Sequence, residues 1–388
     1  MALSILQTPA TCSLAQSPII FSVVESDTSI VANSGFQYVG ELYYWTGSLT
    51  QSSSVADYTM VKFPNVSLCG IFDLNRIINS TLTDLAEVNK SNVIYFAVDF
   101  YPQYYNGTSY VTGSHLKSST YKALDGYAIF QEPIGQQVYD KTPHWPLMTD
   151  GPATQSVFLD NYGTAGVYVG DAGSTAPTKI VYTSNLGSAD YTLSATTSTS
   201  GQIAQYPIGP LQSGFPLSTT GMEYFTVRAF NGGTALGSAI KYVVDCQQKY
   251  PNVRIKWKNR FGQFDFFNFY MVNKQSLQTE KKTYQPQLGT WESSTLSYAK
   301  PDSGVLNYIV DSKQAIQVNS FWMSESYNDI LKELMVSDEI YWVYDEANNY
   351  VRPLTMQTSN IVFKTGVVDK LIQYQFDFDY GQAYKLII

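Results

Sequence analysis

The stretch formed by residues 253–271, VRIKWKNRFGQFDFFNFYM, constrains the fold of this chain more than any other segment. It begins as an alternating strand, with Val253, Ile255 and Trp257 on one face and basic residues on the other, which is the period of two of a half-buried strand. A turn follows, where Gly262 can adopt a positive φ without a Cβ clash. The segment therefore predicts a β-hairpin.

Six aromatic side chains follow or flank that turn. They are Phe261, Phe264, Phe266, Phe267, Phe269 and Tyr270. Aromatic surface on this scale must be buried, either in the core of this domain or against a neighbouring subunit. The sequence leaves both alternatives open.

The composition indicates a mostly β protein. Only 14% of the residues are charged, against roughly 25% in an average globular protein. Tyr is very frequent, at 31 residues. Few charges together with many aromatic and β-branched residues favour strands over helices. We therefore expect a multi-domain chain of β-sandwich domains with a few short helices.

The net charge of −8 argues against a nucleic-acid-binding surface, because phosphate contacts need clustered Lys and Arg. The one basic cluster, from Arg254 to Arg260, is interpreted as the solvated face of a strand. No window approaches the length of apolar sequence that a membrane span needs. Neither nucleic acid nor a membrane is an expected partner.

Four regions are expected from the length of 388 residues and from the shifts in composition. Residues 1–130 are predicted to form a β-sandwich with one helix, and residues 131–155 a Pro-rich linker. Residues 156–247, low in charge and rich in Gly, Ser and Thr, suit an immunoglobulin-like or fibronectin-III-like sandwich. Residues 248–388 are predicted to form a β-rich domain with one helix.

Helical periodicity appears twice. Residues 73–85 repeat apolar side chains at helical spacing with Asp73 as N-cap, and residues 326–335 do so after Ser326-x-x-Asp329, which resembles a capping box. Between these helices lies a strand from Val93 to Tyr101, predicted to close at Pro102.

The C-terminal part predicts a hairpin and a final strand. Residues 339–344 and 350–356 alternate around a polar turn. In the final strand Tyr374, Phe376 and Phe378 alternate with acidic or amide residues, so one face is buried. We expect the Phe cluster after the 259–262 turn to pack on that strand.

Signals for catalysis or metal binding are weak. His115 and His144 are interpreted as surface loop residues, because neither neighbours a nucleophile or metal motif. Acidic pairs such as Asp345 and Glu346 are interpreted as solvated turn residues. The three cysteines lack metal-ligand or disulfide spacing and are interpreted as small buried hydrophobes; they are Cys12, Cys69 and Cys246. We expect no enzyme, no metal and no cofactor.

Three stretches resemble counterparts in virion proteins of tailed phages that infect Bacteroidota, including crAss-like phages. The first comprises SPIIFSVVES, FQYVGELYYW and GIFDLNRII; the second is KWKNRFGQFDFFNF; the third comprises LKELMVSDEIYWV, YVRPLTM and FKTGVVDKLIQYQFDFDYG. They cover both ends of the chain and leave the middle sandwich unmatched. The resemblance implies a tail-associated structural subunit of a ring, hub or distal-tail layer, made in the host cytoplasm and found in the virion.

In that family such proteins have no catalytic residues to carry over. Gly262 and Asp265 match the recurring turn, with Gly serving backbone geometry and Asp capping a turn amide. The candidates for structural or interface roles are Trp257, Phe261, Gly262, Phe264, Asp265, Phe267, Phe269, Tyr374, Phe376 and Phe378.

The leading hypothesis is a homo-oligomeric ring built by heterologous contacts, with other tail or portal-proximal proteins as further partners. The alternative is a receptor-binding adhesin whose middle domain binds a host-surface glycan. A glycan hydrolase ranks last, because no carboxylates are grouped with a cleft.

Overall fold

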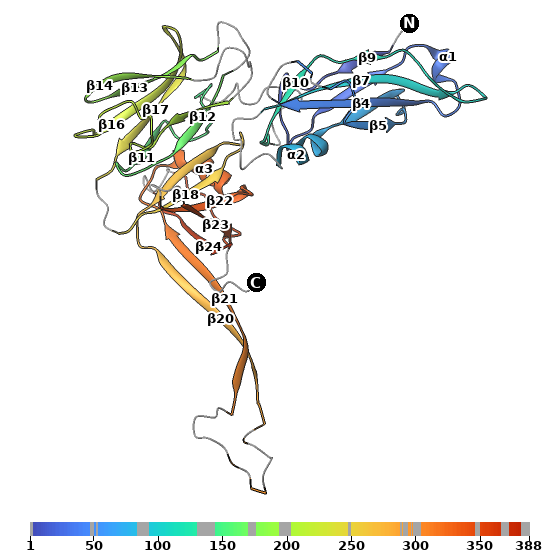
Figure 1. Ribbon diagram of the computed structural model, residues 1–388. Coiled ribbons are helices and arrows are strands. Elements are labelled where there is room, and N and C mark those ends of the chain that lie inside the picture. The colour runs from blue at the N-terminus through green and yellow to red at the C-terminus, as the bar shows by residue number, and fades with distance from the viewer. Residues whose placement is uncertain are drawn as a thin grey trace. The chain divides into compact units, whose positions relative to one another are not determined.

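The computed structural model of the chain is built mainly from strands, which confirms the expected mostly β class with few helices (Figure 1). It describes residues 3–46, 50–51, 53–83, 93–129, 144–169, 176–193, 203–246, 250–287, 289, 294–295, 297, 304–345, 350–365 and 372–381.

The chain divides into two compact units, each assembled from separate segments. Unit 1 comprises Met1–Cys246, Trp257–Phe266 and Ser326–Ser337. Unit 2 comprises Gln247–Lys256, Phe267–Glu325 and Asp338–Ile388. The segment of residues 253–271 is thus shared between the two units.

The N-terminal part of unit 1 is a sandwich of two sheets. The smaller sheet has the order β1 (Ser4–Gln7), β3 (Ile20–Val24), β6 (Cys69–Asp73). The larger has the order β2 (Cys12–Leu14), β10 (Tyr121–Leu124), β7 (Ile94–Tyr105), β4 (Gln37–Thr46), β5 (Tyr58–Lys62), with β8 (Tyr110–Thr112) and β9 (Leu116–Lys117) also on β7. Phe21, Phe72 and Phe100 are buried between the sheets.

Two short helices accompany this sandwich. α1 (Thr28–Val31) begins at Asp27, whose side chain accepts a hydrogen bond from Ser29 N. α2 (Asn75–Thr83) forms where helical periodicity predicts it, and Asp73 Oδ1 accepts from Asn75 N at 3.2 Å. The predicted end of that helix, Leu85, lies outside the described residues.

The strand predicted to close at Pro102 continues to Tyr105, so that prediction is wrong. Pro102 pairs with Tyr38 of β4 and lies between the residues of β7 that pair with β9 and those that pair with β8. Its carbonyl accepts from Gly113 N at 2.8 Å. Proline is tolerated there because neither β8 nor β9 pairs with β7 at that residue.

The middle part of unit 1 is a second sandwich. One sheet has the order β11 (Thr154–Val157), β17 (Thr234–Val244), β16 (Tyr224–Asn231), β13 (Lys179–Ser184), β14 (Gly187–Thr192), and it packs on β12 (Thr164–Tyr168) paired with β15 (Ile203–Pro207). Tyr182, Tyr206 and Phe225 are fully buried between these sheets. The borders predicted at residues 130, 155 and 247 stay predictions, and most of the predicted linker lies outside the described residues.

A seven-stranded sheet has most of its residues in unit 2. Its order is β19 (Phe264–Phe269), β18 (Val253–Lys258), β22 (Ile340–Asp345), β23 (Tyr350–Met356), β24 (Gln375–Tyr380), β21 (Leu306–Asn319), β20 (Lys274–Tyr284). The predicted hairpin is confirmed, since β22 and β23 are antiparallel neighbours. The predicted packing is also confirmed, because the ring centroids of Phe269 and Phe376 lie 5.8 Å apart.

Strands β20 and β21 continue beyond the sheet as a two-stranded ribbon, which Figure 1 shows as two long paired arrows. β21 pairs with β24 only from Ala315 to Asn319, whereas its pairing with β20 extends to Leu306 opposite Tyr284. Every residue of β20 is exposed. Among the described residues, no second layer covers this ribbon.

α3 (Asn328–Val336) follows a turn of 3-10 helix, η2 (Glu325–Tyr327). Its apolar face of Ile330, Leu331 and Leu334 is buried, as the periodicity predicts. The predicted capping box does not form, because the helix begins at Asn328 and the preceding Tyr327 makes no side-chain cap.

Candidate functional site

The basic residues of the 254–260 segment are buried, so their interpretation as a solvated strand face is wrong. Arg254 is 3% exposed, and Lys258 and Arg260 are each 6% exposed. Buried cations need partners, because an isolated charge in the interior is costly. The site is built around those partners.

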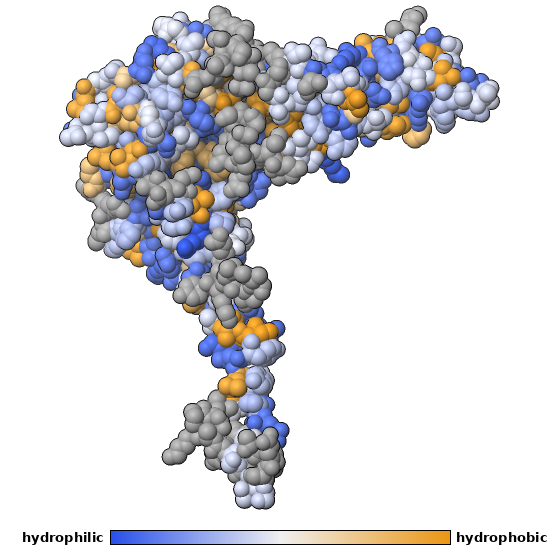
Figure 2. Space-filling view, viewed as in Figure 1, coloured by the Kyte–Doolittle hydropathy of each residue, from blue (hydrophilic) through white to orange (hydrophobic). Residues whose placement is uncertain are grey.

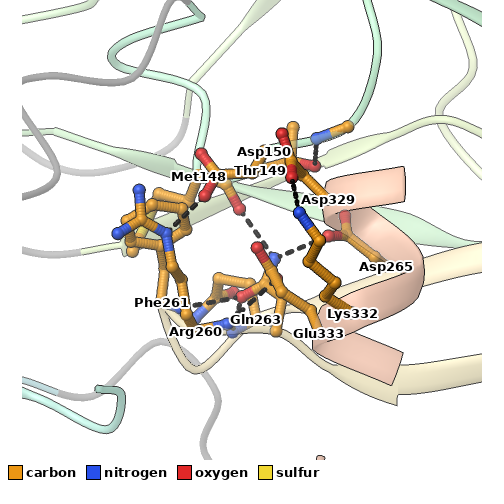
Figure 3. A network of polar contacts seen from close by, with 12 residues as sticks. Met148, Thr149, Asp150, Arg260, Phe261, Gln263, Asp265, Asp329, Lys332 and Glu333 are labelled. Carbon is orange, nitrogen blue, oxygen red and sulfur yellow. Dashed lines mark hydrogen bonds and ion pairs between the residues drawn. The ribbon is translucent and has the colours of Figure 1, made fainter. Parts of the chain in front are cut away.

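Two ion pairs join this segment to distant parts of unit 1. Lys258 Nζ lies 2.8 Å from Asp125 Oδ2, just after β10. Arg260 Nε pairs with a carboxylate oxygen of Asp150, just before β11, and its guanidinium lies 4.6 Å from the ring centroid of Phe261. The polar cluster is defined here as Asp125, Asp150, Lys258, Asn259, Arg260, Asp265 and Glu333. Figure 3 shows Asp150, Arg260, Asp265 and Glu333.

Asn259 organises the turn inside the polar cluster. Its Oδ1 accepts hydrogen bonds from Phe261 N and Gln263 N, each at 3.0 Å. Its Nδ2 donates to Met148 O at 2.9 Å and to Asp265 Oδ2 at 3.1 Å. Asn259 therefore caps the turn amides, which is the role that the sequence assigned to Asp265.

Gly262 has the predicted left-handed backbone, with φ +72°. The structure adds a second requirement, because a Cβ at this position would lie 1.7 Å from Asp125 O. The neighbouring backbone is tied down as well, since Tyr127 N donates to Arg260 O at 2.9 Å. The turn thus packs directly against the chain that follows β10.

Two carboxyl groups of the polar cluster hold their protons more tightly than usual. Burial raises the pKa of Asp265 to about 7, although Asn259 and Thr149 donate hydrogen bonds to it. Burial, with Asp265 and Asp150 nearby, raises the pKa of Glu333 to about 9. Figure 3 shows Glu333 projecting from α3 toward the turn, where Arg260 N donates to its Oε2 at 3.2 Å.

The charges of the polar cluster add to the effect of burial on these two pKa values. It contains four carboxyl groups and two cations, and the cations form ion pairs with Asp125 and Asp150. Like charges at close range disfavour full ionisation, so Asp265 and Glu333 retain protons. The polar cluster holds the hairpin in place and can take up or release a proton.

The predicted site residues separate into two groups. Phe261 packs in unit 1 beside Leu124 and Met148. Phe267 and Phe269 pack in unit 2, with their ring centroids 4.7 Å apart. The other predicted aromatic residues are also buried; they are Trp257, Phe264, Tyr374, Phe376 and Phe378. Of the two alternatives left open, the chain's own core accounts for this aromatic surface.

Sequence reasoning missed Asp125, Asp150 and Glu333, which lie far from the turn along the chain. Only the local excess of basic residues in a strand hinted that carboxylates must be brought to them. His144 was also misinterpreted, because it is buried with Nε2 3.0 Å from Gly151 O, and burial lowers its pKa. Of the cysteines, Cys12 is buried as predicted but Cys246 is exposed.

The described residues also bear on metal binding and on membrane insertion. No group of three or more His, Cys, Asp or Glu side chains in that part of the chain is placed to hold a metal ion. In the same part, no helix is long and apolar enough to cross a membrane.

Comparison with known proteins does not name a family. No family model matches the chain, and no curated protein matches it. Among solved structures, it is similar to chimeric titin Z1Z2 functionalized with a KLER peptide from decorin, at 12% identity and a TM-score of 0.16, covering 63% of this chain and 98% of that one. It is also similar to a mutant of Salmonella alpha-2-macroglobulin, at 10% identity and a TM-score of 0.18, covering 97% of this chain and 27% of that one. Scores this low carry no argument about function.

Proposed function

We propose that the chain is a structural subunit of a tailed-phage virion, which assembles with copies of itself in a ring, hub or distal-tail layer. The observation that carries this proposal is the β20–β21 ribbon. The resemblance of the two ends of the chain to phage virion proteins gives the biological setting.

The ribbon favours assembly because it is poorly suited to stand alone. Two-stranded hairpins are marginally stable in water unless something packs on them. This one exposes large apolar side chains, among them Leu277 and Tyr308. Figure 2 shows hydrophobic surface on the ribbon. A neighbouring subunit would cover it, as subunits do in assemblies that interlock.

The polar cluster supports the same function. Its members form hydrogen bonds and ion pairs with one another and fix the hairpin that is shared between the two units. A cluster satisfied in this way rigidifies a subunit. We assign it a scaffold role.

The test is the protein content of purified particles. We expect mass spectrometry of particles from the encoding phage to detect the chain in many copies, and cryo-electron microscopy to place it in a symmetric tail layer. Absence from purified particles, with the chain present in the lysate, would contradict the proposal.

A second candidate function, binding of a host-surface glycan, is favoured by one observation. Tyr344 and Tyr350 are both exposed, and their rings stack with centroids 6.1 Å apart. Flat aromatic surfaces with a polar tip suit ligands that are partly apolar and partly wet. A glycan array probed with the wild type, Tyr350→Ala and the control Tyr110→Ala tests this. Binding lost only in Tyr350→Ala would support it, and a silent array would exclude it for the glycans displayed.

A further inference from the structure

Four exposed apolar side chains lie on the loop that follows β5 and on β6 of the N-terminal sandwich. Phe63 is 72% exposed, Val66 104%, Leu68 46% and Ile71 49%. These four residues are called the knob. Single exposed apolar residues are ordinary, but several on one loop and the strand that follows it indicate a binding surface.

The knob is held in a fixed shape before any partner arrives. Asn65 Oδ1 accepts hydrogen bonds from Ser67 N at 2.9 Å and Cys69 N at 3.0 Å. Tyr38 Oη, from the buried core, donates to Leu68 O at 2.7 Å. Leu68 itself has φ +59°, a strained conformation for a residue other than Gly. Strain of this kind is concentrated at functional surfaces, and a rigid surface loses little entropy on binding.

The ribbon is a second apolar surface of a different shape. Leu277 is 51% exposed, Tyr284 48% and Tyr308 60%. β20 is the last strand of its sheet, and among the described residues it pairs only with β21. Its outer edge therefore offers backbone donors and acceptors to another chain.

The ribbon and the N-terminal part of the chain carry net charges of opposite sign. The ribbon strands carry four lysines and two carboxylates, a net +2, so the remainder of the chain carries −10. Residues 1–129, which include the knob, carry nine acidic and five basic residues, a net −4. Opposite net charge favours an encounter of the ribbon of one copy with the N-terminal part of another and disfavours contact between two ribbons.

We infer that the ribbon of one copy docks on the knob of the next copy. Because the two surfaces differ, the contact is heterologous, and repeating it gives a closed ring or an open filament. The inference rests on the part of the proposed function that has copies assembling, and it is independent of where the assembly is found.

Mixing two defective variants of the full chain tests the pairing. Val66→Asp damages the knob, and the double change Leu277→Asp with Tyr308→Asp damages the ribbon. We expect the wild type to form oligomers in sedimentation velocity and each variant alone to remain monomeric. An equimolar mixture should give a heterodimer and nothing larger, because such a pair retains one intact knob and one intact ribbon.

Controls distinguish a loss of docking from a loss of folding. All of the substituted side chains are exposed, so melting temperatures should match the wild type. Val362→Asp, at a residue 76% exposed but outside both surfaces, should leave assembly unchanged. A monomeric wild type, a variant that assembles normally, or a mixture that stays monomeric while both variants are folded would each overturn the inference.

The docking inference and the proposed virion function can each fail without the other. If the chain occurs in purified particles and both variants are still incorporated into them, the docking inference is wrong and the virion role stands. If the mixture forms the heterodimer but the chain is absent from particles, the docking holds and the virion role fails.

Discussion

Gly262 carries two demands at one position, a left-handed backbone and the absence of a side chain. We expect Gly262→Ala to lower the free energy of unfolding by more than the ~1–3 kcal/mol of backbone strain alone, because its Cβ would collide with Asp125 O. Urea denaturation measures this change.

Gly232 supplies the matched control. It also has a positive φ, +57°, but a Cβ there would meet nothing within 4 Å. Gly232→Ala therefore reports strain without collision. Equal losses for the two variants would show that the contact with Asp125 contributes nothing to stability.

Glu333 should make the stability of the chain depend on pH. Burial raises its pKa from an ordinary 4.5 to about 9 in the folded chain. The folded state therefore keeps a proton that the unfolded state loses, so this group's contribution is fully present below about pH 4 and is lost as the pH rises through about 9. We expect Glu333→Gln, which stays neutral, to melt at a higher temperature than the wild type at pH 9 and at a similar temperature at pH 4.

Asp265 should act in the same direction at lower pH, since burial raises its pKa to about 7. The control for Glu333→Gln is Glu280→Gln, at an exposed residue of β20. Its melting temperature should equal that of the wild type at every pH. A Glu333→Gln variant that lost stability in parallel with the wild type between pH 5 and 9 would count against the raised pKa.

For single residues, the sequence correctly predicted the backbone conformation of this segment and wrongly predicted that its basic side chains are exposed. The positive φ of Gly262 follows from the residue type, and the alternation of residues 253–258 predicts a strand. Alternation cannot show that Lys258 and Arg260 are buried, because their carboxylate partners come from segments more than a hundred residues earlier. Such pairing is a property of the whole fold.

Among the elements, the ribbon is the one that we expect to contribute least to folding, because every residue of β20 is exposed. The change tested is the replacement of residues 279–312 by an Asn-Gly turn. Gln278 pairs with Lys313, so a two-residue turn between them keeps the pairing of the remaining residues of β20 and β21. Because β20 is exposed throughout, we expect the free energy of unfolding to change by no more than about 0.5 kcal/mol. Urea denaturation checks stability, and sedimentation velocity should show that assembly is lost.

A stability loss well beyond that range would mean that the ribbon supports the sheet of unit 2. Oligomers that persist in the shortened variant would instead place the assembly contact elsewhere on the chain. Unchanged stability together with lost assembly is the result expected if the ribbon contacts neighbouring copies.

Element types were predictable where one face is buried and one is not. The final strand, with Phe376 and Phe378 inward, follows from its alternation, and α3 follows from the spacing of its apolar residues. The ends of elements were less predictable. β7 passes through Pro102 because neither β8 nor β9 pairs with it at that residue, and no local signal in the sequence reports the positions of those two strands.

At the scale of the whole molecule, the chain passes between its two units five times. Unit 1 is therefore completed by two late segments, one with Phe261 and one with Glu333. We expect the fragment of residues 1–246 to unfold at a lower urea concentration than unit 1 in the full chain. Its amides around Leu124 and Met148 should also exchange hydrogen faster, because Phe261 no longer covers them.

Hydrogen exchange read by mass spectrometry makes this comparison for the same peptides in the fragment and in the full chain. Peptides of the N-terminal sandwich core around Phe72 serve as the internal reference, because the described residues of that core all come from the chain up to Ala123. Identical protection at Leu124 and Met148 in both proteins would show that residues 1–246 fold to completion without the late segments.

The late arrival of those segments has a consequence for synthesis on the ribosome. Residues 247–337 must be made before Glu333 and the Lys258 and Arg260 ion pairs can complete unit 1. At about 5–20 residues per second, these 91 residues take roughly 5 to 18 seconds. Asp125 and Asp150 have no cation from the hairpin until Lys258 and Arg260 are made early in that interval, and unit 1 stays unfinished until the segment with Glu333 follows at its end. Unit 1 can therefore be completed only after residue 337 has been translated.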